Sequence, residues 1–243
     1  MSALGHYLEE ESIATVAISL IRPQTENTKP PRALWVPFEL GRPFGPPGDA
    51  DFQRRVVLAA LRLLERQDGP VLLEDFPDDD PRLHPDPNWQ PPSLPALATD
   101  RSAVAAAARM VAEVQALDGA HRRWTQQHGR TTAGVSGLPI ADAAHYVAEW
   151  LRGHSPDSPR DGFSAPLELR FAIDDLKAYA LEAAGAGPAK PSSRQLGDWL
   201  WNDTATGAAI QALRALLLQS EEPRLKLIAE NFIVPGARVR ASP

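Results

Sequence analysis

The chain has 243 residues, enough for one large domain or two small ones. Hydrophobic residues make up 43% of the chain and charged residues 23%, so a globular fold with a sizeable core is expected. A net charge of −6 gives no general attraction to phosphate backbones or anionic lipid, which argues against nucleic acid and membrane as partners. The absence of cysteine excludes disulfides, thiolate catalysis and cysteine-based metal sites.

The beginning of the sequence carries no secretory signal pattern. Its strongest apolar run, from Ile13 to Ile21, is far shorter than the about 20 residues that a membrane-spanning helix needs. We therefore expect a cytoplasmic protein.

Residues 1–76 alternate between helical and strand patterns. Apolar residues on helical spacing predict helices, and short β-branched apolar runs predict strands buried in a parallel sheet. The expected order is a helix closing at residues 9–11, strands over 13–20 and 33–36, a helix from the N-cap Asp49 to about 66, and a last strand at 71–73.

A proline-rich, acidic segment follows at residues 77–96. Seven prolines lie among aspartates there, and proline disfavours both helix and central strand. We interpret the segment as a solvated linker; the alternative is a docking arm that carries Trp89.

Residues 97–235 are mostly helical in pattern, and residues 236–243 form a tail. Helices are predicted over 101–127, 139–151, 166–184, 193–219 and 223–231. The fold class is therefore α/β, with a small parallel sheet followed by a helical domain.

The helical domain is expected to have its core around Trp199. Apolar residues recur every three or four positions along 193–219, and a matching stripe lies on 166–184, so the two faces should pack together. The stripes consist of Leu196, Leu200, Leu213 and Leu217, and of Leu169, Ile173, Leu176 and Leu181. The alternative for the cluster of Trp199 and Trp201 is a ligand-binding box.

Residues Tyr7–Leu64 carry a family resemblance. An I-x-T-V strand is followed by Pro31-Arg32-Ala33 at a second strand, then by the loop Gly41-Arg42-Pro43-Phe44-Gly45-Pro46-Pro47-Gly48-Asp49 and an amphipathic helix. This order, over about a quarter of the chain, resembles the C-terminal part of the substrate-reducing B subunit (selenoprotein B) of the glycine, sarcosine, betaine and D-proline reductases. The resemblance implies a Rossmann-like sheet and an oxidoreductase function.

The sequence departs from this family at the redox residue. In the family a cysteine or selenocysteine lies at the turn before the first helix, where this chain has Met1-Ser2-Ala3-Leu4. Because such a reductase needs a thiolate or selenolate nucleophile, either a partner chain supplies it or this chain has lost the chemistry. The family's preceding strands are also missing, so we expect an open sheet edge at the strand over 13–20.

The loop Gly41–Asp49 is the candidate substrate site. It follows a strand, where α/β proteins bind ligands, and Arg42 could pair with the carboxylate of a small amino-acid substrate. Gly41, Gly45 and Arg32 are included in this prediction, and Arg22 shares the argument with less weight. The alternative is a rigid Pro/Gly turn that only leads into the next helix.

Two further segments have alternative interpretations. His145 and Glu149 lie one helical turn apart and could offer two metal ligands, but no third is visible, so a surface ion-pair face is preferred. The segment 129–139 leads into a helix N-terminus and could hold an anion, or it is an ordinary connecting loop. No metal and no cofactor is predicted.

Two functions are therefore carried forward. The first is a reductase-family subunit that works with a separate chain bearing the redox residue, and the second is a non-catalytic helical interaction or scaffold protein. Because the chain lacks a thiol, we expect it to show no thiol-dependent reductase activity alone.

Overall fold

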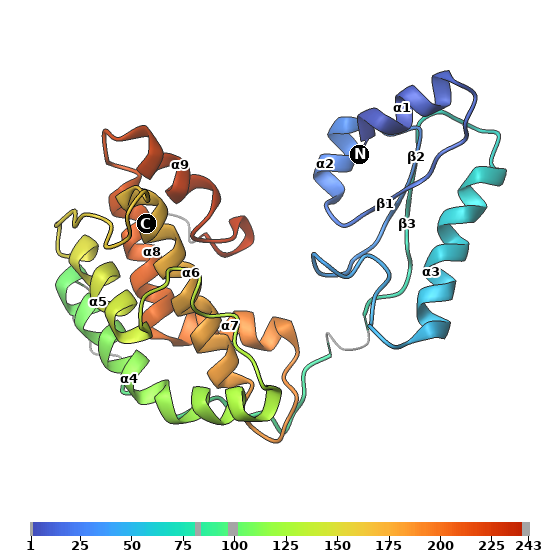
Figure 1. Cartoon of the computed structure of the whole chain (residues 1–243). Coiled ribbons are helices and arrows are strands. Elements are labelled where there is room, and N and C mark those ends of the chain that lie inside the picture. Colours follow the sequence, from blue (N-terminus) through green and yellow to red (C-terminus); the bar gives the residue numbers. More distant parts are fainter. Residues whose placement is uncertain (1, 81–83, 97–101, 240–243) are drawn as a thin grey trace. The chain divides into compact units, whose positions relative to one another are not determined.

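The computed structural model describes residues 2–80, 84–96 and 102–239. The chain divides into two compact units, Met1–His84 and Pro85–Pro243 (Figure 1). Each unit has its own hydrophobic core. The first unit contains a parallel sheet and the second is helical, which confirms the predicted fold class. Among the described residues, no helix is long and apolar enough to cross a membrane.

The α/β unit is built on a three-stranded parallel sheet of order β1-β2-β3. Ala33 is in register with Ala17 on one side and with Leu73 on the other. The elements are α1 (Ser2–Glu10), β1 (Ala17–Ser19), α2 (Arg22–Thr28), β2 (Arg32–Trp35), α3 (Ala50–Arg62), the 3-10 turn η1 (Leu63–Glu65) and β3 (Leu72–Asp75).

Strand β1 is one of the two edge strands of this sheet, and among the described strands it pairs only with β2. The predicted open edge at this strand is confirmed. The prediction of a long strand over 13–20, buried on both faces, is wrong, because β1 spans only Ala17–Ser19 and is half-buried. An edge strand has a neighbour on one side only, which limits how deeply its residues are covered.

Helix α2 was not predicted. The sequence pattern treats Arg22-Pro23 as a gap, but residues Arg22–Thr28 form a helix with proline in its first turn. Proline is well suited to that position because the first helical N–H groups have no partner within the helix. The short helix buries only Thr25, so it has too few apolar positions to give a periodic signal.

The core of the α/β unit lies between α3 and the strands. Asp49 caps α3 by accepting a hydrogen bond from the Phe52 amide at 3.0 Å, as predicted. Phe52 then packs against Phe38 and Phe76, with ring centroids 5.5 and 6.0 Å away. Three aromatic side chains from separate segments therefore hold the helix, the loop after β2 and the end of β3 together.

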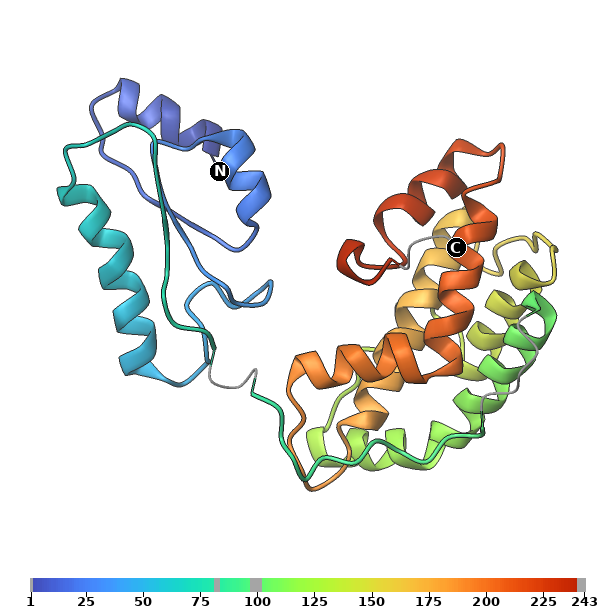
Figure 2. The ribbon, with the colours of Figure 1, turned by 180° about the vertical axis from the view of Figure 1, so that it is seen from behind.

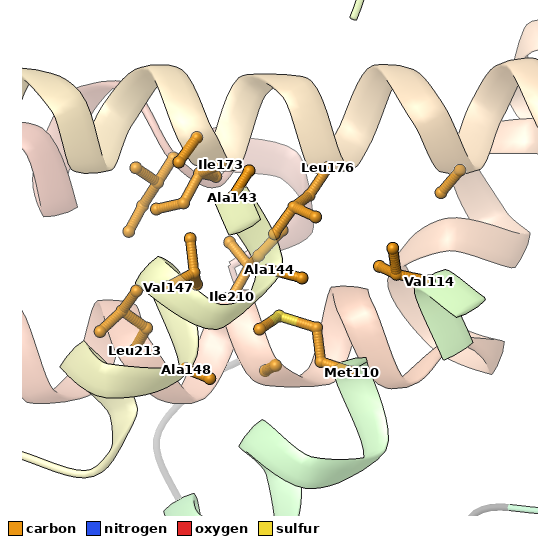
Figure 3. Packing of buried hydrophobic residues seen from close by; sticks show 14 of the residues in the cluster. Met110, Val114, Ala143, Ala144, Val147, Ala148, Ile173, Leu176, Ile210 and Leu213 are labelled. Atoms are coloured by element: carbon orange, nitrogen blue, oxygen red, sulfur yellow. The ribbon is translucent and has the colours of Figure 1, made fainter. Parts of the chain in front are cut away.

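The helical unit contains six α-helices among the described residues. They are α4 (Ala103–His128), α5 (Ile140–Leu151), α6 (Ala165–Ala184), α7 (Ser193–Asp203), α8 (Ala205–Leu217) and α9 (Pro223–Asn231), followed by the 3-10 turn η3 (Gly236–Arg238). Figure 2 shows the same elements from behind. Met110, Val147, Ile173 and Leu213, from four different helices, meet in the core shown in Figure 3.

The core predicted around Trp199 is confirmed. Trp199, Leu200, Leu213 and Leu217 are buried and belong to the same cluster as Leu169, Ile173 and Leu176 of α6, while Leu196 and Leu181 are partly buried against it.

The prediction of one continuous helix over 193–219 is wrong. The chain turns at Thr204, which ends α7 and caps α8 by accepting a hydrogen bond from the Gly207 amide at 2.9 Å. The buried Glu113 of α4 also accepts hydrogen bonds from the amides of Ala205 and Thr206, at 2.6 and 3.0 Å. These tertiary contacts replace the hydrogen bonds that a continuous helix would make.

Residues 85–96 lie against the helical unit. Gln195 accepts a hydrogen bond from the Asp86 amide at 2.8 Å and donates one to the Asp86 carbonyl at 3.0 Å. The Trp89 indole donates to the Ala184 carbonyl at 3.1 Å and packs against the core. These contacts at Asp86 and Trp89 favour the docking-arm alternative for residues 85–96 over a solvated linker.

Candidate functional site

The carboxyl edge of the sheet is the first candidate site. The strands are parallel, so the ends of β1, β2 and β3 at Ser19, Trp35 and Asp75 lie at one edge. Open α/β sheets bind ligands at this edge. Arg22, which follows β1, and the loop 37–49, which follows β2, are therefore positioned where the sequence analysis places a substrate.

Arg22 is occupied by partners within the chain. Its Nε donates to the Asp75 carboxylate at 3.0 Å, and a second ion pair joins it to Glu26. The hydrogen bond to Asp75, helped by both negative charges, raises the pKa of Arg22 above its ordinary value. A substrate carboxylate would have to displace Asp75 or Glu26, so Arg22 is poorly suited to bind one.

Arg42 is better placed to meet an external group. Its side chain is 42% exposed, and its ion pair with Glu39 is long, at 4.0 Å. The preceding Gly41 has a φ of +89°, a conformation that glycine adopts without strain, and nothing lies within 4 Å of the position a Cβ would take. Arg42 and Gly41 stay a predicted carboxylate site on an open part of the loop.

Gly45 has a packing role. It has a φ of +81°, and a Cβ at this position would collide with the ring of Phe52. The backbone of the loop therefore approaches the aromatic core closely because residue 45 has no side chain. This contact favours the rigid-turn interpretation for the second half of the loop.

Arg32 lies at the other end of the sheet. It begins β2, and its guanidinium donates to Glu9 of α1 at 2.6 Å. The same carboxylate accepts from the amide of Thr15 at 2.6 Å, and this bond is the main cause of the lowered pKa of Glu9. The structure thus does not bring Arg32 together with the loop that holds Arg42.

The described hydroxyl groups at the carboxyl edge are not activated. Ser19 and Thr25 hydrogen bond to each other, and Thr25 donates to the Ile21 carbonyl at 3.0 Å. Neither contact involves a base that could remove a proton. Ser19 and Thr25 therefore offer no nucleophile beside the exposed Arg42.

The predicted anion-binding loop of the helical unit is filled from within. The Asp175 carboxylate on α6 accepts hydrogen bonds from the amides of Gly134, Val135 and Ser136, at 2.7, 2.8 and 2.9 Å. The Ser136 hydroxyl, at 2.5 Å, donates to it as well. An external anion would compete with a buried carboxylate, so the connecting-loop alternative is favoured.

Asp175 is one of three buried carboxylates on α6 that sequence reasoning missed. Glu168, Asp175 and Glu182 repeat every seven residues on α6, which places them along one face. Their spacing, E-x6-D-x6-E within an apolar helix, was the available signal. Each one holds a segment that has no regular structure.

Glu182 holds the beginning of the loop 130–138. It accepts hydrogen bonds from the Thr131 hydroxyl at 2.6 Å, from the amide of Thr132 at 2.7 Å, and pairs with His121 at 2.9 Å. Burial raises the pKa of Glu182, but the hydrogen bonds from the two threonines and His121 together outweigh it, and the pKa is lowered. The ionised carboxylate is the form that this site stabilises.

Glu168 pairs with Arg160 from the loop between α5 and α6. The Arg160 Nε donates to Glu168 at 2.7 Å, and the guanidinium lies 3.9 Å from the ring centroid of Phe163. Glu168 is fully buried while Arg160 is partly exposed. This pair fixes the loop over α6.

Among the described residues, no third ligand lies with His145 and Glu149 to complete a metal site. Within the described residues, no three histidine, aspartate or glutamate side chains are grouped to hold a metal ion. Glu149 pairs with Arg152 and with His154, which lies at 2.5 Å, and these two hydrogen bonds lower its pKa. The preferred ion-pair face is formed by Glu149 with these partners, and His145 is exposed.

Comparisons with known proteins add no relative. No protein-family model, no curated protein and no solved structure matches this chain.

Proposed function

We propose that this chain is one subunit of a substrate-reducing oxidoreductase and that a separate chain supplies the redox cysteine or selenocysteine. The proposal is supported by the resemblance of Tyr7–Leu64 to the B subunits of glycine and D-proline reductases and by the absence of cysteine. In this arrangement Arg42 binds the carboxylate of a small amino-acid substrate at the carboxyl edge of the sheet.

The observation that carries the proposal is the open edge of β1. The Ser19 carbonyl accepts from the Val36 amide at 2.8 Å, so Ser19 directs its backbone groups toward β2. Alternate residues of a parallel strand direct these groups to opposite sides, so the N–H and C=O of Ile18 face the open edge. Exposed Ile13 and Ile21 flank the strand, which suits the addition of a strand from a second chain.

The experiment compares two variants of this edge. Ile18→Pro removes the outward N–H, whereas Ile18→Ala keeps the N–H although it removes more of the side chain than the proline variant does. Each tagged full-length chain is recovered from its native cells, and the proteins bound to it are identified. We expect a partner with a redox cysteine or selenocysteine on the wild-type and Ile18→Ala chains and not on Ile18→Pro.

The recovered complex is then assayed for dithiol-dependent reduction of glycine, sarcosine, betaine and D-proline. Turnover by the complex, absent from this chain alone and reduced by Arg42→Ala, is the expected result. Turnover by the isolated chain, or a β1-dependent partner without a redox residue, would overturn the proposal. The latter result would favour the second candidate, a non-catalytic interaction protein.

A further inference from the structure

Helix α3 presents apolar side chains on two opposite faces. Phe52, Val56 and Ala60 face the core of the α/β unit. On the outer face Val57, Leu58 and Leu61 are 37%, 44% and 48% exposed. An amphipathic surface helix normally has polar residues there, so this outer face requires an explanation.

The outer face has a self-complementary order of residues. Arg54, Leu58, Leu61 and Glu65 follow one another at spacings of four, three and four, so they form one stripe along α3 and η1. The stripe begins with a cation, continues with two leucines and ends with an anion. Within the part of the chain that the structure describes, neither Arg54 nor Glu65 forms an ion pair.

We propose that a second copy of this chain packs on α3 as an antiparallel helix pair. A twofold axis midway between Leu58 and Leu61 places Leu58 of each copy against Leu61 of the other. The same axis places Arg54 of each copy against Glu65 of the other. A twofold contact uses the same patch on both copies. Read in the opposite direction, the order cation, leucine, leucine, anion becomes anion, leucine, leucine, cation, so two antiparallel stripes match.

The neighbouring charges favour this register. Arg55 is paired with Asp78, and Arg66 with Asp68 and Glu74, so these arginines are neutralised within one chain. Among the described residues neither Arg54 nor Arg62 forms an ion pair, and of these two only Arg54 faces Glu65 of the second copy in this register. Complementary charges at the ends of an apolar seam set the orientation and register of paired helices.

The contact is small, which sets the expected affinity. Helix α3 has 13 residues and is therefore about 20 Å long. A single helix pair of this length buries less than the roughly 1,200–2,000 Å² typical of stable interfaces. We expect a reversible dimer whose population rises with concentration in the micromolar range.

The test uses sedimentation velocity of the full chain over a concentration series. Arg54→Glu and Glu65→Arg each place like charges at both ends of the seam, so each variant alone should remain monomeric. An equimolar mixture of the two restores an Arg–Glu pair at both ends and should dimerise. The double variant, which only exchanges the charges, should dimerise like the wild type.

Arg224→Glu is the matched control, because it makes the same charge change at an exposed position of α9 and should leave dimerisation unchanged. Since residues 54 and 65 are both exposed, circular dichroism should be the same for all variants. A wild-type chain that stays monomeric throughout overturns the proposal. A dimer that ignores the single changes, or a mixture that does not associate, does so as well.

Discussion

In the helical unit, single buried carboxylates accept backbone hydrogen bonds from loop residues, which elsewhere are satisfied within helices. Residues 134–136 cannot satisfy their amides through a helix or sheet, and Asp175 accepts all three. Burying a charge is costly unless it is fully hydrogen bonded, and removing one partner leaves the others unsatisfied. Asp175 and the loop are therefore stable only together.

Asp175→Asn tests this dependence. The asparagine amide has one acceptor oxygen where the carboxylate has two, and its NH2 group would face the amide donors of the loop. We therefore expect the free energy of unfolding to fall by about 3 kcal/mol. Asp174→Asn is the control, because Asp174 is partly exposed and its pairs with Arg170 and Lys177 should contribute about 1 kcal/mol or less. Urea denaturation measures both, and equal effects would contradict the assigned role of Asp175.

Glu182 gives a pH dependence with a defined sign. Its pKa in the folded protein is below the ordinary value of 4.5, so the ionised form stabilises the fold. That stabilisation is present above pH 4.5 and is lost as the pH falls through the folded pKa. Glu182→Gln should be less stable than the wild type at pH 7, and the gap should narrow below pH 4.5. A gap that stays constant from pH 7 to pH 3 would exclude this linkage.

At the scale of elements, periodic sequence patterns predicted most helices. They failed where tertiary contacts determine the position at which a helix ends. The helices α3, α4, α5, α6 and α9 follow apolar spacing, caps and glycine stops in the sequence. The break at Thr204 depends on Glu113, which is remote in sequence, so helical spacing alone continues across it. Helix α2 escaped prediction because it buries one polar residue.

The candidate site was predictable only in part, for the same reason. The loop after β2 could be placed at a carboxyl edge, since parallel strands fix that geometry. The ion pair between Arg22 and Asp75 joins residues 53 positions apart, and local pattern does not indicate it. The contact of Asp175 with Gly134 spans 41 positions, so the loop looked open to an external anion.

The corner between α7 and α8 depends on a glycine. A Cβ on Gly207 would collide with the Leu200 carbonyl, because the start of α8 crosses closely over α7. We expect Gly207→Ala to lower the free energy of unfolding by about 2 kcal/mol through this overpacking.

Gly119→Ala is the matched comparison, since Gly119 lies within α4 with its nearest contact at 3.8 Å. Alanine favours helix over glycine there, so stability should rise by about 0.5–1 kcal/mol. In thermal denaturation, Gly207→Ala should lower the melting temperature and Gly119→Ala should raise it. If both changes stabilise the protein, the close crossing is not a constraint.

At the scale of the whole molecule, the arm over residues 85–96 belongs to the helical unit. Its contacts run from Asp86 to Gln195 and from Trp89 to Ala184, and the boundary between the units falls just before it. Each unit has a separate core, so each should unfold as its own cooperative transition. The arm should then stabilise the helical transition only.

Two fragments test where the helical unit begins. We expect residues 85–243 to fold alone and to reproduce the helical transition of the full chain in calorimetry. Residues 97–243 lose the arm, and with it the packing of Trp89 and its hydrogen bond to Ala184, so their free energy of unfolding should be lower by about 2–3 kcal/mol.

Trp89→Ala within residues 85–243 should account for most of that loss, because Trp89 is the arm's largest side chain against the core. Asn88→Ala should not, since Asn88 is exposed and only its backbone amide bonds to Asp86. If residues 97–243 melt like residues 85–243, the arm contributes no stability and the helical unit begins after it.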